Sequence, residues 1–122
     1  MAAGKHDITI EQGADFTLTA LYTNPEGAII PLTGWTGRMQ IRQSPSSPSP
    51  VVSLPGVDGT ITITGAAGKV EVFIPAETTA QIALYGKSTG TFAYDLEIVE
   101  TATGRVKRLL KGTATVDAEI TR

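Results

Sequence analysis

The clearest sign of the fold class is the segment Phe92-Ala93-Tyr94-Asp95-Leu96-Glu97-Ile98-Val99. Large apolar side chains stand at every second position, which is the period of a β-strand that buries one face. Thr103-Gly104 then turns the chain into a second long β-compatible run, Arg105 to Val116. The two runs predict a long hairpin as the closing element of the fold.

The second run contains one conflict. Leu109 and Leu110 are adjacent, so a regular strand would turn them to opposite faces. A β-bulge near Gly112 would resolve the conflict.

Working outward from this hairpin, the same alternation appears in two earlier segments. Residues 15–23 turn Phe16, Leu18, Ala20 and Tyr22 to one side, and residues 35–43 carry Arg38 and Arg42 on their outer side. Shorter β-compatible runs are bounded by turns containing Gly or Pro and cover residues 8–10, 28–30, 51–54, 60–64 and 69–74. One segment, residues 75–84, is compatible with one or two helical turns.

About seven or eight short strands with turn signals at this spacing are typical of a β-sandwich. We therefore predict an all-β fold, a single antiparallel β-sandwich of immunoglobulin-like type with about one short helix. The length of 122 residues suits one domain. We expect a flexible N-terminal arm at residues 1–7 and the sandwich at residues 8–122, with the Pro/Ser-rich segment 44–50 as an extended, solvated loop.

Composition argues against several classes of partner. The 10 basic and 12 acidic residues give a net charge of -2, and no run of Lys or Arg is long enough to hold a phosphate backbone, so we expect no nucleic acid. The absence of cysteine leaves no disulfide or thiolate metal site. No segment has the roughly 20 apolar residues of a membrane helix, and the N-terminus lacks the apolar core of a signal peptide, so we expect no membrane partner.

Residues suited to catalysis are few. The single histidine, His6, lies in the expected arm, where nothing would hold it in a catalytic arrangement. Asp95 and Glu97 share one strand face, but this spacing is also the ordinary polar side of a half-buried strand. We expect no catalytic residues, no metal, no cofactor and no small-molecule substrate, and the chain is predicted not to be an enzyme.

Two other features allow a binding role. The basic residues Arg38, Arg42, Arg105, Lys107, Arg108 and Lys111 would form a patch if their strands share a face, although we favour cross-strand pairing with Asp95 and Glu97. Trp35, at a strand entrance, either plugs the end of the sandwich, which we favour, or is an exposed anchor for a partner.

Several segments resemble a pattern found in small phage and prophage structural proteins. The resemblance covers nearly the whole chain and is carried by residues 7–16, 31–36, 38–42, 68–70, 74–76, 94–98, 108–113 and 119–122. The chain is similar to the immunoglobulin-like N-terminal domain of phage baseplate upper proteins, in which a "QG" turn and a connection ending in Leu-Thr-Gly recur. Gln12-Gly13 and Gly27 to Gly34 fit these two features.

The resemblance implies a non-enzymatic virion protein, made in the host cytoplasm and present in multiple copies, that docks onto a larger phage protein. A tail, baseplate or tail-fibre adaptor is the first interpretation, a capsid decoration protein the second, and a carbohydrate-binding host-attachment module the third. An adaptor would use the arm and a decoration protein the Pro/Ser-rich loop. The candidate partner-binding residues are Lys5, His6, Trp35, Pro45, Pro48 and Pro50.

Overall fold

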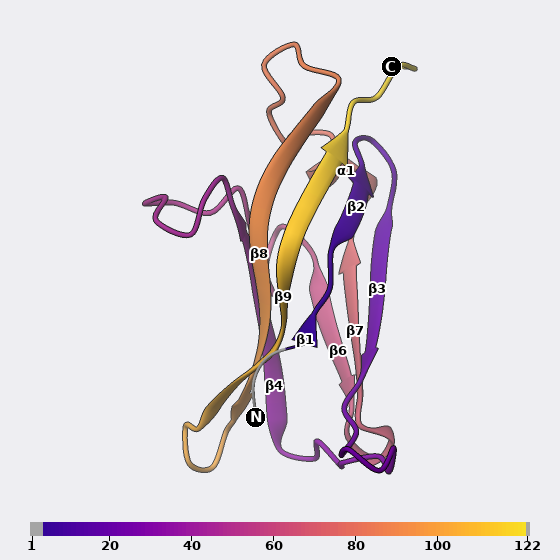
Figure 1. Cartoon of the computed structure of the whole chain (residues 1–122), viewed down its shortest axis with the longest axis vertical. Helices are drawn as coiled ribbons and strands as arrows, with labels where there is room; N and C mark the ends of the chain where they lie inside the picture. The colour runs from indigo at the N-terminus through magenta and orange to yellow at the C-terminus, as the bar shows by residue number, and fades with distance from the viewer. Residues whose placement is uncertain (1–3, 122) are drawn as a thin grey trace.

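The computed structural model describes residues 4–121, which form two β-sheets packed face to face (Figure 1). The elements in chain order are β1 (Gly4–Lys5), β2 (Ile8–Glu11), β3 (Phe16–Leu21), β4 (Trp35–Arg42), β5 (Val52–Leu54), β6 (Thr60–Thr64), the 3-10 turn η1 (Gly65–Ala67), β7 (Lys69–Ile74), α1 (Ala76–Thr79), β8 (Thr89–Glu100) and β9 (Val106–Asp117). The predicted all-β sandwich is confirmed.

The larger sheet has the order β1-β9-β8-β4-β5, with β2 also paired to β9, and the smaller sheet has the order β3-β7-β6. This arrangement corresponds to immunoglobulin-like sandwiches, in which strands G, F and C form one sheet and strands B, E and D the other. Every strand pair is antiparallel except β1 and β2 with β9, which are parallel. The larger sheet is therefore mixed, whereas the sequence predicted a wholly antiparallel sandwich.

The core lies between the sheets and is made by the alternate residues identified from the sequence. Phe92, Leu96 and Val72 are all buried, as are Met39 and Ile41 of β4. The side chains at the intervening positions, such as Arg38 and Asp95, turn to the outer face, because a strand turns successive side chains to opposite faces. The strand phases predicted for residues 35–43, 69–74 and 92–99 are confirmed.

The long hairpin β8–β9 contains the expected bulge at a different residue. Leu96 lies opposite Leu110, but the next residue of β8, Glu97, lies opposite Arg108. Leu109 is thus the extra residue, and Gly112 stays in the regular ladder opposite Tyr94. The bulge lets Leu109 and Leu110 both pack against the core as partly buried residues.

The prediction of a flexible N-terminal arm is wrong for residues 4–7. The rest of the predicted arm, Met1 to Ala3, lies outside the described residues. Gly4 and Lys5 pair with β9, and the His6 main-chain N–H donates to the carbonyl of Lys111 at 2.9 Å. Gly112 permits this close approach, because a Cβ there would stand 2.3 Å from the His6 carbonyl oxygen. The pattern of β9 gave no sign that its outer edge would bind the N-terminal segment.

The short helix expected within residues 75–84 is confirmed as the four-residue α1, whose Thr79 is buried. The expectation for the Pro/Ser-rich segment is corrected. The segment 44–50 is mostly exposed and stands out from the side of the sandwich (Figure 1), but it is not extended. It contains a turn in which the N–H of Ser47 donates to the carbonyl of Ser44 at 3.1 Å.

Candidate functional site

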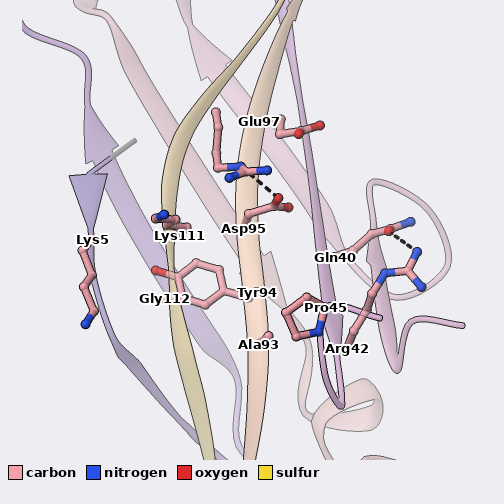
Figure 2. Close-up of a pocket in the computed structure, with 11 residues that line it drawn as sticks. Lys5, Gln40, Arg42, Pro45, Ala93, Tyr94, Asp95, Glu97, Lys111 and Gly112 are labelled. Carbon is pink, nitrogen blue, oxygen red and sulfur yellow. Dashed lines mark hydrogen bonds and ion pairs between the residues drawn. The ribbon is translucent and has the colours of Figure 1, made fainter. Parts of the chain in front are cut away.

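A hollow of about 550 Å³ lies on the outer face of the larger sheet, beside the Pro/Ser-rich loop (Figure 2). Its floor is formed by side chains of β8 and its sides by β4 and β9, with Lys5 of β1 at one margin and Pro45 at the other. The lining residues are Lys5, Gln40, Arg42, Pro45, Ala93, Tyr94, Asp95, Glu97, Arg108, Lys111 and Gly112.

The register of three strands explains why charges gather here. Asp95 of β8 lies between Gln40 of β4 and Lys111 of β9. One step further along, Glu97 lies between Arg38 and Arg108. An acidic central strand is thus flanked by two strands with basic side chains, an arrangement that favours cross-strand ion pairs. We call the set Lys5, Arg38, Arg42, Asp95, Glu97, Arg108 and Lys111 the charged face.

Ion pairs join the three strands. Arg38 Nε lies 2.7 Å from Glu97 Oε1, and Arg108 Nε lies 3.3 Å from Asp95 Oδ2. These pairs confirm the predicted cross-strand pairing for Arg38 and Arg108. Both arginine side chains are about half exposed, so the pairs orient the side chains more than they stabilise the fold.

Arg42 has a different role. Its Nη1 donates to the carbonyl of Ser47 at 2.7 Å. Its Nη2 donates to Gln40 Oε1 at 2.8 Å (Figure 2). The first bond ties the Pro/Ser-rich loop to β4 and fixes Pro45 at the margin of the hollow. Among residues 4–121, no carboxylate forms an ion pair with this guanidinium.

The charged face is positive even though the whole chain is negative. Five basic side chains stand against two acidic ones, an excess of three positive charges. Within residues 4–121, Lys5, Arg42 and Lys111 take part in no ion pair. The surplus charge is therefore available to a partner.

Two titratable groups that line the hollow, Asp95 and Tyr94, have raised pKa values. Burial, and then the nearby Glu97 carboxylate, raise the pKa of Asp95 above its usual value despite the neighbouring arginines. Burial, and then the charge of Asp7, raise the pKa of Tyr94 to about 12. The Tyr94 hydroxyl donates to the His6 carbonyl, so it is a structural group.

Of the six residues proposed from sequence, Lys5 and Pro45 line the hollow. The main chain of His6 pairs with β9 beside it, and the His6 side chain is exposed. Pro48 and Pro50 belong to the same loop outside the hollow. Trp35 lies at the far end of β4, half-buried against the core, with Lys107 Nζ 5.7 Å from its ring centre.

The other basic members of the site belong to the patch that the sequence pattern allows if their strands share a face. Arg42, Arg108 and Lys111 occupy outward positions of strands, but their convergence depends on which strands are neighbours. Across residues 4–121, no group of three His, Cys, Asp or Glu side chains is arranged to hold a metal ion. In that same range no helix has the length and apolar character needed to cross a membrane.

Comparison with known proteins adds no relative. Neither a protein-family model nor a curated protein matches the sequence.

Proposed function

We propose that this chain is a non-enzymatic structural component of a bacteriophage particle that docks onto a larger virion protein. The observation that carries the docking role is the positive charged face, with its uncompensated Lys5, Arg42 and Lys111 beside the exposed Pro45. The phage assignment rests on the resemblance of the sequence to virion structural proteins.

The chemistry of this surface favours an acidic protein partner. A convergent excess of positive charge steers association and fixes register, and it discriminates against basic surfaces. Pro45 adds an apolar contact whose position is set by the bond from Arg42 to Ser47. Because these residues stand on paired strands, little backbone freedom is lost when a partner binds.

Within the particle, the first candidate location is a tail, baseplate or tail-fibre adaptor, with capsid decoration as the alternative. The participation of Lys5 in the charged face supports the adaptor, for which the N-terminal segment was expected to contact a neighbour. The position of Pro45 at the same hollow supports the decoration role.

Sugar binding has weaker support. A carbohydrate module needs exposed aromatic rings on which sugars stack, and Tyr22 and Tyr94 are buried. Trp35 is half-buried, and Tyr85, 81% exposed, stands in a separate loop. These aromatic side chains form no common platform.

The first test is a cryo-EM reconstruction of the intact particle from a phage that encodes this chain. We expect density for the sandwich in the tail or baseplate, with the charged face against a neighbouring protein. Density on the capsid lattice would support decoration instead. Absence of the chain from the particle, or hydrolysis of glycan by the pure protein that is lost in Glu97→Gln, would overturn the proposal.

A second test distinguishes a specific role of the charged face from the effect of changing the net charge of the chain. Arg42→Glu and Lys111→Glu are expected to reduce incorporation into particles, whereas Lys87→Glu, which makes the same charge change in an exposed loop, is expected to incorporate normally. Incorporation of the first two variants at the normal level would show that another surface docks.

A further inference from the structure

The edge strand β3 offers a second interaction surface, independent of the charged face. It is the terminal strand of the smaller sheet, and within residues 4–121 no strand pairs with its outer edge. Its sequence, Phe16-Thr17-Leu18-Thr19-Ala20-Leu21, contains no charge, proline or bulge. Soluble proteins usually protect an edge of this kind, and an unprotected one is a site for pairing with another strand.

The hydrogen-bond register shows which main-chain groups are available. Just after β3, the N–H of Tyr22 donates to the carbonyl of Gly68, on the β7 side, at 2.8 Å. Bonded and non-bonded positions alternate along an antiparallel pair, so the even-numbered residues of β3 turn their main-chain groups toward β7. Thr17, Thr19 and Leu21 therefore turn their N–H and C=O groups to the open edge.

We propose that β3 pairs with β3 of a second copy of this chain, antiparallel, about a two-fold axis at Thr19. The joined smaller sheets would form one continuous six-stranded sheet. In this register Thr19 lies opposite Thr19 of the second copy, and Thr17 lies opposite Leu21. Each of these pairs exchanges two main-chain hydrogen bonds.

The side chains favour this register. On the inner side Leu18 comes opposite Ala20, and Phe16 opposite Tyr22, so apolar groups meet apolar groups. On the outer side Leu21, 57% exposed in the single chain, is covered by Thr17 of the second copy. An axis at Leu18 would instead place the carboxylate of Asp15 beside Leu21, which favours the axis at Thr19.

Charge does not oppose the pairing. The acidic side chain nearest the axis on the outer side is Glu71, which lies beside Thr19 and 3.5 Å from Lys69 Nζ. The two Glu71 side chains of the dimer would be three strand spacings apart, roughly 14 Å, which exceeds the Debye length of about 10 Å at 0.1 M salt. The charged face lies on the other sheet, so each copy keeps it free for the docking partner.

The other uncharged edge, β6, fits a second copy less well. Gly65 follows β6 directly, and its carbonyl accepts a hydrogen bond from Leu32 at 2.8 Å, so a crossing segment lies at one end of the strand. Pairing of β3 with β6 of the next copy would also be heterologous and would produce open chains or rings. A two-fold β3 pair closes on itself.

Disulfide trapping tests the register directly, because the chain has no cysteine of its own. In the proposed dimer the two Thr19 Cα atoms are about 5.5 Å apart, within the range that a disulfide spans. Thr19→Cys is expected to form a covalent dimer on mild oxidation. Thr62→Cys, an equally outward residue on β6, is the matched control and is expected to remain mostly monomeric.

A non-covalent measurement complements the trap. The edge is short, so the dimer is expected to be weak and is best measured by sedimentation over a range of protein concentrations. Thr19→Lys places two like charges together at the axis and should raise the dissociation constant about tenfold or more. Thr62→Lys should leave it unchanged, and circular dichroism checks that both variants are folded.

Three outcomes would overturn the proposal: equal trapping of Thr19→Cys and Thr62→Cys, a monomer at every concentration, or a ladder of higher oligomers. The first two would leave the edge open to a strand of a different protein, and the ladder would indicate heterologous pairing. None of these results depends on the charged face or on a phage origin, so the two proposals can fail separately.

Discussion

Tyr94 of β8 donates a hydrogen bond to the main-chain carbonyl of His6, 88 positions away in the chain. Tyr94 lies opposite Gly112, which has no side chain. The Tyr94 ring therefore has room to extend over β9 toward the N-terminal segment (Figure 2). This contact, together with the β1 and β2 pairings, joins the start of the described chain to the closing hairpin.

Replacing the Tyr94 hydroxyl tests how strongly it holds the N-terminal segment. Tyr94→Phe keeps the ring but leaves the His6 carbonyl without this donor, which should cost about 1 kcal/mol of unfolding free energy. Denaturant titration measures the loss, and hydrogen exchange should rise at residues 4–7. Tyr85→Phe, at an exposed ring, is the control; equal stability of both variants would mean that the Tyr94 bond contributes nothing.

Thr79 connects α1 to the turn after β2. Its hydroxyl donates to the Ala14 carbonyl at 2.8 Å and accepts from the Gly13 N–H at 3.0 Å. Thr79→Val preserves the shape but leaves both main-chain groups unsatisfied, so we expect a loss of about 1 to 3 kcal/mol in thermal or chemical unfolding. Thr78→Val in the same helix should stay within about 0.5 kcal/mol, and a similar loss there would point to helix propensity instead.

Leu96 is fully buried at the centre of the larger sheet, opposite Met39 on one side and Leu110 on the other. Leu96→Ala removes this packing and leaves a cavity, so we expect a loss of about 2 to 5 kcal/mol. Val57→Ala, at a fully exposed side chain, is expected to have little effect. A loss below roughly 1 kcal/mol at Leu96 would contradict its central position in the core.

The raised pKa of Asp95 predicts the direction of a pH effect. Between its unfolded pKa, near 3.8, and its higher folded pKa, the folded state binds more protons. Stability from this group is therefore highest at low pH and is lost as pH rises through the folded pKa. The stability of Asp95→Asn relative to the natural chain should increase from pH 3 to pH 7.

Carboxyl NMR titration measures this group directly. A folded-state pKa at or below 3.8 would show that the pair with Arg108 outweighs burial. The stability difference between Asp95→Asn and the natural chain would then decrease, or stay level, over the same pH range.

The β-sandwich and most strand positions could be predicted from the sequence, because alternation of apolar residues is a local property. Phe92, Leu96 and Val72 could be assigned to the core without knowing their neighbours, since their own strands show which side is buried. The turns were also readable, because Gly and Pro restrict the backbone wherever they stand.

Which strands are neighbours depends on long-range contacts that the sequence pattern does not show. Lys5 joins Arg42 and Lys111 at one hollow because the N-terminal segment runs parallel to β9, and that pairing depends on the missing side chain of Gly112. The edge of β3 is open for the same reason: β1 and β2 pair with β9 in the larger sheet and not with β3. Pairing of this kind joins residues that are distant in the chain, so no local pattern encodes it.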